Sequence, residues 1–282
     1  MPDNNNAPQI EYWNGSTGER WMRYQQALDR TLGPLGEVAI QAAQIVPGAR
    51  VLDVGCGCGD TVLALADRVG SEGWVTGVDV SEPMLARARE RIAQRAHGSA
   101  VIELQLGDAA SVALPDELDL IFSRFGVMFF ADPKAAFLHL AESARPGADL
   151  AFVCWQRFEN NPWAHVPAHA MKPFLPADPP SPAGAPGPFA FADPDRLRAI
   201  LEPRFSELSI EPYESRLVWT PPSMEEAIDF FSNIGPSARP LREAAPEART
   251  RALAALDEAL RPHLTPDGLV LGTAVWIVTA RC

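Results

Sequence analysis

The stretch Val51-Leu52-Asp53-Val54-Gly55-Cys56-Gly57-Cys58-Gly59-Asp60 decides the fold, because it combines a buried strand, a glycine turn and the start of a helix. Glycines in such a turn let backbone N–H groups approach a ligand that side chains would exclude. The dinucleotide fingerprint is G-x-G-x-x-G, whereas this turn is G-x-G-x-G and Asp60 replaces the last glycine. Asp53 and Asp60 would repel a pyrophosphate. They suit a ligand that carries an ammonium or a sulfonium group.

Two more acidic residues end the strands that follow. Asp79 closes Gly77-Val78-Asp79-Val80-Ser81, about twenty residues after the turn, where a carboxylate can accept both hydroxyls of a ribose. Asp108 follows the next strand in Gly107-Asp108-Ala109. Each carboxylate alone could be an ordinary solvated loop residue. Asp53, Asp79 and Asp108 stand at the carboxyl ends of successive strands, where open α/β sheets bind ligands. Their positions therefore predict a nucleoside site.

Short β-branched runs alternate with amphipathic runs after the glycine turn, which is typical of a parallel sheet with helical crossovers. Apolar residues between the first two strands recur at helical spacing, and Ser81 is placed to cap the next helix, which has Pro83 in its first turn. The predicted strands are Arg50 to Val54, Trp74 to Asp79, Val101 to Leu106, Leu118 to Ser123 and Asp149 to Trp155.

The pattern breaks after Trp155. Residues 156–188 are rich in proline and carry several aromatics without a clean period, so we expect a cap insertion over the active site. Residues 189–282 return to regular elements and complete the core with helical substrate-cap elements. The expected helices are 194–201, one within 224–234 and one within 241–264, and the expected strands are 208–212 and 269–280.

The residues from Val51 to Trp155 resemble a class I S-adenosylmethionine-dependent methyltransferase, nearest to the ubiquinone and menaquinone biosynthesis type. The resemblance implies an α/β, Rossmann-like fold over a 36–155 core, with a mostly parallel seven-stranded sheet and helices on both faces. It also implies a donor site. The glycine loop (Asp53, Gly55, Cys56, Gly57) would hold the methionine moiety and Asp79 the ribose. Val80 and Met84 would sandwich adenine, Asp108 and Ala109 would bind its amino edge, and the Ser123 carbonyl would accept from the ammonium.

Methyl transfer from a sulfonium is an in-line displacement, so alignment and a dry site can supply much of the acceleration. A general base is needed only if the acceptor must lose a proton. The candidates for catalytic roles are His165, in the cap, and Arg124, which could bind an acceptor carboxylate, brace the donor pocket or form a structural ion pair. Apolar and aromatic residues near the expected acceptor entrance favour a small, partly apolar acceptor methylated on oxygen or nitrogen, and a peptide acceptor stays open.

Aromatic residues are also concentrated before the first strand, in Tyr12-Trp13-Asn14-Gly15 and at Trp21. Residues 1–35 are expected to form a helical lid, and in one hypothesis Tyr12 or Trp21 touches the donor. In the alternative these rings only pack the helix onto the cap.

Composition limits the partners. The formal net charge of -12 disfavours nucleic acid and anionic membranes. The first six residues lack a secretion signal and no apolar run is long enough to span a bilayer, so we expect a cytoplasmic protein. The four cysteines lack metal-site spacing, so no metal is expected. A homodimer, a nicotinamide-dependent oxidoreductase and a non-catalytic S-adenosylmethionine-binding regulator are alternatives that the sequence leaves open.

Overall fold

The centre of the molecule is a sheet with the strand order β3-β2-β1-β4-β5-β8-β6, and a two-residue strand, β7, pairs with β8 at its end. The computed structural model describes residues 6–95, 100–177, 182 and 184–282. The strands are β1 (Arg50–Val54), β2 (Trp74–Asp79), β3 (Val101–Leu106), β4 (Leu118–Arg124), β5 (Ala144–Trp155), β6 (Ser206–Trp219), β7 (Leu264–Thr265) and β8 (Gly268–Arg281).

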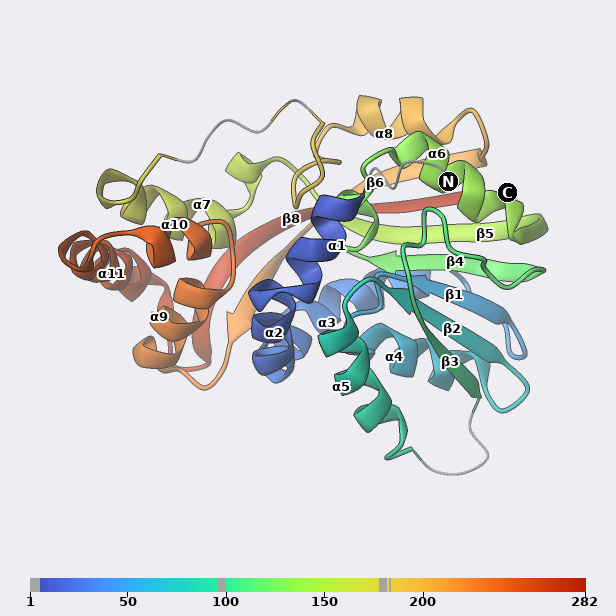
Figure 1. Ribbon diagram of the computed structural model, residues 1–282, viewed down its shortest axis with the longest axis horizontal. Coiled ribbons are helices and arrows are strands. Elements are labelled where there is room, and N and C mark those ends of the chain that lie inside the picture. The colour runs from blue at the N-terminus through green and yellow to red at the C-terminus, as the bar shows by residue number, and fades with distance from the viewer. Residues whose placement is uncertain (1–5, 96–99, 178–181, 183) are drawn as a thin grey trace.

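Helices cover both faces of this sheet (Figure 1). The longer helices are α1 (Ala7–Asn14), α2 (Ser16–Arg23), α3 (Gln25–Ala42), α4 (Asp60–Val69), α5 (Glu82–Ile92), α6 (Pro133–Glu142), α7 (Pro162–Met171), α8 (Pro194–Leu201), α9 (Met224–Asn233), α10 (Ala238–Glu243) and α11 (Pro246–Leu260). Helices α3, α4 and α5 lie on one face and α6 and α8 on the other. The predicted seven-stranded, mostly parallel arrangement is confirmed, with β7 as an addition.

The five strands of the core are parallel, and their register places the acidic strand ends side by side. Asp53 of β1 lies opposite Gly77 of β2, and Asp79 of β2 lies opposite Leu106 of β3. β1 is almost wholly buried, as its residues Val51, Leu52 and Val54 lead one to expect, and the buried Asp53 is the exception. The apolar strand β8 pairs with both β5 and β6 in antiparallel fashion, so its backbone has partners on both sides.

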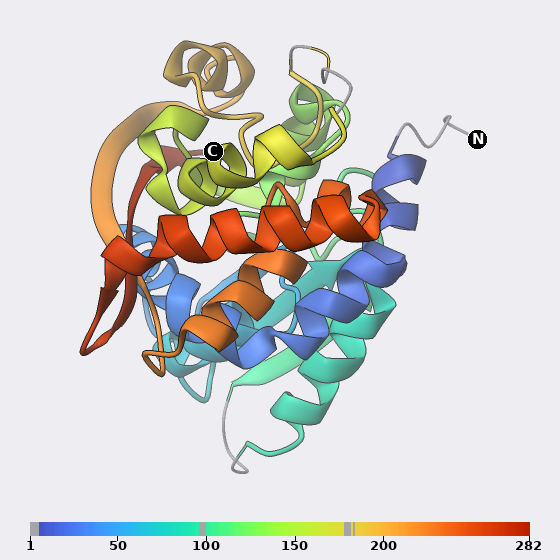
Figure 2. The same cartoon turned by 90° about the vertical axis from the view of Figure 1, so that its left-hand side faces the viewer.

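Two parts of the chain are more regular than their sequences suggest. The strand expected at 208–212 is the first part of the 14-residue β6, which bends along β8. The proline-rich insertion contains α7, which packs against α11 and β8, and α11 in turn packs on α9 (Figure 2). Residues 1–5 of the expected lid and 178–181 and 183 of the expected cap lie outside the described residues. Among the described helices, none combines the length and the apolarity needed to cross a bilayer.

The N-terminal helices lie between the sheet and the helical group α9–α11 (Figure 1). Tyr24, between α2 and α3, donates to Asp229 of α9 at 2.5 Å and packs its ring edge-on to Phe230. Arg30 of α3 donates to the carbonyl of Thr220 at 3.3 Å. The start of the chain is therefore attached to the C-terminal helices as well as to the core.

Candidate functional site

The turn after β1 requires glycine. Gly55, Gly57 and Gly59 have φ values of +71°, +53° and +81°, a region that other residues rarely adopt. A Cβ on Gly55 would stand 2.7 Å from the Cα of Gly126, so the turn after β1 and the turn after β4 touch through their backbones. This contact fixes the carboxyl end of β4 against the glycine turn.

Asp53 is fully buried beneath this turn. Its Oδ2 accepts a hydrogen bond from the Thr61 hydroxyl at 2.5 Å, whereas its Oδ1 has no partner among the described residues. Burial raises the pKa of Asp53 to about 7, and the Thr61 hydrogen bond and Arg124 oppose the rise. A buried carboxylate oxygen without a donor is costly, so Asp53 is suited to receive one from a bound group.

Asp79, at the end of β2, is bonded to the backbone on both sides. Its Oδ2 accepts from the N–H of Gly57 and its Oδ1 from the N–H of Ser81, each at 2.8 Å. Burial raises its pKa to about 6, opposed by these backbone hydrogen bonds. The carboxylate therefore joins the glycine turn to the start of α5.

Asp108 completes the acidic rim. The N–H of Gly107 donates to the carbonyl of Asp79 at 2.9 Å, which places the two strand ends together. The Asp108 side chain accepts from the N–H of Ala110 at 3.0 Å, and Asp108 and Ala109 are both buried. Asp53, Asp79 and Asp108 thus lie along one edge of the sheet, as the strand pattern predicts.

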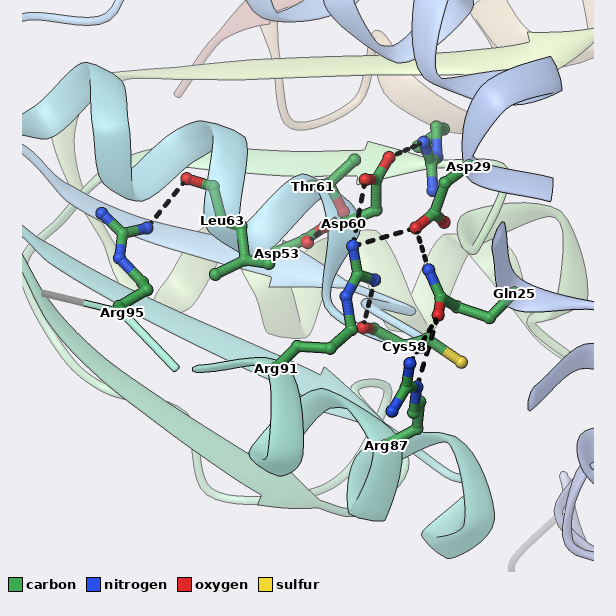
Figure 3. A network of polar contacts seen from close by, with 11 residues as sticks. Gln25, Asp29, Asp53, Cys58, Asp60, Thr61, Leu63, Arg87, Arg91 and Arg95 are labelled. Carbon is green, nitrogen blue, oxygen red and sulfur yellow. Dashed lines mark hydrogen bonds and ion pairs between the residues drawn. The ribbon is translucent and has the colours of Figure 1, made fainter. Parts of the chain in front are cut away.

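A second polar network supports the glycine turn from the side of the helices (Figure 3). Arg91 of α5 donates to the carbonyl of Cys58 at 2.7 Å and pairs with Asp29 at 2.9 Å and with Asp60 at 3.5 Å. Asp60 also pairs with Arg124 at 2.6 Å. Arg124 therefore forms a structural ion pair with the first residue of α4, which is one of the three roles expected for it. Its catalytic role stays a prediction.

The other residues expected at the donor site surround this rim. Met84 is buried, and its sulfur lies 3.8 Å from where a Cβ on Gly57 would stand. Val80 is half-buried. Cys56 is buried, and burial raises the pKa of its thiol well above the usual value, so it is a packing group rather than a thiolate. The hydroxyl of Ser123 donates to the carbonyl of Val54 at 2.8 Å and so ties β4 to β1.

The N-terminal helices cover the end of β2, but through residues that sequence reasoning did not single out. The Trp13 ring packs edge-on to Trp21 and Phe129, at centroid distances of 5.4 and 5.2 Å. Its carbonyl accepts from the Ser81 hydroxyl at 2.7 Å, and the neighbouring Asn14 bonds to the same turn. Tyr12 is 48% exposed and packs on Trp13. Donor contacts by Tyr12 or Trp21 stay predictions.

Ser81 does not cap α5 as expected. It occupies the N-cap position, but its side chain makes no capping hydrogen bond because the hydroxyl donates to the Trp13 carbonyl. Asn14 supplies the missing acceptor, since its Oδ1 accepts from the N–H of Glu82 at 3.0 Å. No local pattern near Ser81 could have shown this, because the partner is 68 residues away in the sequence.

A row of aromatic rings begins beside the glycine turn and extends into the cap. Phe125, which has a strained φ of +61°, stacks on Trp155 at 4.1 Å with an interplanar angle of 8°. Trp155 contacts Trp163, which stacks on Phe189. These four rings therefore form one contiguous aromatic layer, whereas Phe191, which was expected in the same group, contacts Phe137 and Phe152 instead.

His165 lies on α7 at the far end of this layer. Its ring contacts Phe158 and His169 at centroid distances of 6.2 and 5.7 Å. Burial and the neighbouring His169 lower its pKa, so its imidazole is neutral at pH 7. A catalytic role for His165 stays a prediction.

One buried asparagine holds the start of the cap. The Asn161 amide nitrogen donates to three carbonyls, including that of Ala274 at 3.0 Å. Its oxygen accepts from Trp163 at 3.0 Å, Thr273 at 3.1 Å and the N–H of Ala274 at 2.9 Å. The residue is fully buried, so these bonds lock the aromatic layer onto β8.

The core of this chain resembles known methyltransferases. Residues 51–147 match the family described as "Methyltransferase domain". The uncharacterized protein Rv1405c of Mycobacterium tuberculosis is 36% identical over 135 residues, which cover 47% of this chain and 46% of that protein. Aklanonic acid methyltransferase DauC of a Streptomyces species is 33% identical over 121 residues, covering 43% of this chain and 54% of the relative. These matches span about half the length of the curated relatives.

Among solved structures, phosphoethanolamine N-methyltransferase 2 of Haemonchus contortus, in complex with S-adenosyl-L-methionine, has a TM-score of 0.58 at 15% identity. The likeness covers 98% of this chain and 59% of that one, and at this identity it shows the fold alone. The residues around the glycine turn fit such a donor, because Asp53 offers a buried, unpartnered oxygen and Asp79 a carboxylate at the strand end.

Proposed function

We propose that this chain, whose core is a class I S-adenosylmethionine-dependent methyltransferase domain, transfers the donor's methyl group to a small, partly apolar acceptor. The observation that carries the proposal is the acidic rim around the glycine turn, where one buried oxygen of Asp53 has no hydrogen-bond donor in the part of the chain that the structure describes. An ammonium or sulfonium group would compensate these carboxylates, whereas the pyrophosphate of a nicotinamide cofactor would be repelled by them.

The proposed donor site divides the work among a few groups. The backbone of Gly55, Cys56 and Gly57 and the carboxylate of Asp53 would hold the methionine end, with the carbonyl of Ser123 close to the ammonium. Asp79 would hold the ribose. Val80 and Met84 would flank adenine, and Asp108 with the Ala109 backbone would bind its amino edge.

S-adenosylmethionine supplies an activated methyl group when bound, so the chain must chiefly orient and shield the reactants. The buried rim and the helices over it can exclude water. The aromatic layer of Phe125, Trp155, Trp163 and Phe189 supports a planar or apolar acceptor, since such rings stack on flat ligands. The neutral imidazole of His165 is the candidate base for an acceptor hydroxyl or amine that must lose a proton. We favour methylation on oxygen or nitrogen.

The test is a turnover assay with donor labelled in its methyl group. The protein is incubated with a panel of phenols, hydroxyquinones, aromatic amines and short peptides, and the products are separated and counted. We expect label in at least one small aromatic acceptor, with S-adenosylhomocysteine formed in equal amount. Label in none of them, together with saturable binding of NAD, would support the oxidoreductase alternative instead.

A further inference from the structure

Asn14, at the end of α1, makes two of the hydrogen bonds that attach the N-terminal helices to the turn after β2. Its Nδ2 donates to the carbonyl of Val80 at 2.6 Å and its Oδ1 accepts from the N–H of Glu82 at 3.0 Å. The Nδ2 also donates to Ile10 of its own helix at 2.9 Å, which fixes the rotamer. A single amide therefore bonds to the backbone on both sides of Ser81.

The surrounding contacts between the N-terminal helices and this turn are close. Ser81 is fully buried and its hydroxyl donates to the carbonyl of Trp13. Gly18 of α2 packs so closely that an added Cβ would stand 2.0 Å from the Trp13 carbonyl oxygen and 2.6 Å from the Ser81 hydroxyl. The segment Trp13–Gly18 is thus fitted to the turn after β2.

The same turn carries the residues proposed to hold the nucleoside. The N–H of Ser81 donates to one oxygen of Asp79, and the N–H of Gly57 donates to the other. A continuous chain of hydrogen bonds therefore runs from Asn14 through the turn and Asp79 to the glycine loop. Asp79 and Met84 are 6% and 5% exposed, and the N-terminal helices pack against the turn between these two residues and against α5.

From this geometry we propose that Asn14 is a positioning residue for the donor. Its amide sets the backbone between Asp79 and Glu82 and holds α1 and α2 closed over the bound nucleoside. Opening of the lid breaks the bond from Asn14 to Val80 and allows exchange of donor for product. The inference rests on the proposed function, because it assigns the covered site to S-adenosylmethionine and its product.

A purely structural role for Asn14 would be to cap α5, since its oxygen takes the place of the missing Ser81 cap. One substitution, Asn14→Asp, distinguishes the capping role from the positioning role. Asn14→Asp keeps an acceptor for the N–H of Glu82 and adds a negative charge at a helix N-terminus, so it preserves or improves the cap. It also replaces the Nδ2 donor by an oxygen that faces the Val80 carbonyl, so it removes the positioning bond.

The experiment measures the dissociation rate of S-adenosylhomocysteine from the full chain by stopped flow, with the tryptophans of the lid as fluorescent reporters. Calorimetry gives the dissociation constant, and chemical unfolding gives the stability of each variant. The variants are Asn14→Asp and Asn14→Ala. Gln41→Ala is the matched control, because it removes an exposed amide that bonds to Glu37 in its own helix.

We expect Asn14→Asp to release the product about tenfold faster than the wild type, the change expected for the lost bond to Val80, and Asn14→Ala, which loses the bonds to Val80 and Glu82, to release it at least as fast. Asn14→Asp should do so with unchanged stability, and Gln41→Ala should behave as wild type. The inference is overturned if Asn14→Asp keeps the wild-type dissociation rate, because Asn14 then acts only as a cap. A wild type that fails to bind S-adenosylhomocysteine overturns the proposed function itself, which is a different result.

Discussion

The donor edge and the aromatic layer of the cap are built in opposite ways. At the donor edge, residues close together in sequence form a polar site, as in the run from Asp53 to Thr61 and the turn after Asp79. In the aromatic layer, rings from four separate segments contact one another from the ends of β4 and β5 into the cap, and one buried asparagine fastens the start of the cap to β8. Substitutions at the donor edge should therefore lower ligand affinity, because they remove charge and hydrogen bonds. Substitutions in the cap should instead lower the stability of the fold, because they remove packing.

The largest effect is expected at Asp79. An asparagine at this position would keep the shape of the side chain but lose the charge and one acceptor, so Asp79→Asn should weaken S-adenosylhomocysteine binding by about 100-fold. Calorimetric titration measures this. Asp267→Asn, in the exposed turn before β8, is the control and should bind normally. Equal affinities for the two variants would mean that Asp79 does not hold the ligand.

The cap should respond through stability. Asn161→Ala removes the acceptor of three donors, the N–H of Ala274, the Thr273 hydroxyl and the Trp163 indole N–H, so the free energy of unfolding should fall by about 3 kcal/mol. Urea unfolding measures the loss. The neighbouring variant Asn160→Ala, at an exposed position, should cost less than about 0.5 kcal/mol. A drop in donor affinity without a drop in stability would contradict the division between the two regions.

The buried carboxylates also predict a pH dependence. Burial raises the pKa of Asp53 to about 7 and that of Asp79 to about 6, so both take up protons in the folded, ligand-free chain more readily than in the unfolded chain. Their contribution to stability is therefore present at acid pH and is lost as pH rises from about 4 to about 7.

The affinity for a cationic ligand should increase as pH rises, in contrast to the stability, because binding requires the ionised carboxylates. The affinity for S-adenosylmethionine should rise about 100-fold between pH 5.5 and 8, with release of protons on binding. Calorimetry in two buffers of different ionisation enthalpy measures the protons released. In Asp53→Asn the upper part of this dependence, near pH 7, should disappear. An affinity that is constant with pH would show that the rim carboxylates do not respond to the ligand's charge.

The smallest effect is expected at the outer end of the aromatic layer. Phe189 is half-buried and stacks on Trp163, so Phe189→Leu should raise the KM for an aromatic acceptor about threefold to tenfold and leave donor affinity unchanged. Leu138→Ala, an apolar truncation at an exposed position on α6, serves as the control. A change in donor affinity instead would place Phe189 at the donor edge.

The sequence predicts where the three acidic strand ends lie because the signals that mark them are local. The glycines and the three acidic strand ends follow short apolar runs, and the parallel register then brings Asp53, Asp79 and Asp108 to one edge. The same reasoning failed at Ser81 and overlooked Asn14, because the hydrogen bonds of both depend on a segment distant in the chain. The sequence analysis expected Tyr12 or Trp21 at this site because their rings are large. The hydrogen bonds to the turn after β2 are instead made by the carbonyl of Trp13 and the side-chain amide of Asn14.

The cap was harder to predict for a related reason. Proline at 162 and 167 obscures the helical period of α7, yet one stands in the first turn of the helix and the helix tolerates the other. Asn161 is the residue that organises this region, and a single asparagine before a proline carries no local signal of burial. Its partners include Ala274 of β8, a strand more than 100 residues later in the sequence that pairs with β5, so the role of Asn161 depends on tertiary structure.

The central claim is that the acidic rim around the glycine turn binds a positively charged nucleoside rather than a diphosphate. Calorimetric titration of the wild type with S-adenosylmethionine, and separately with NAD, tests it most directly. We predict one saturable site for S-adenosylmethionine and no measurable heat of binding for NAD. Saturable binding of NAD with none of S-adenosylmethionine would contradict the claim.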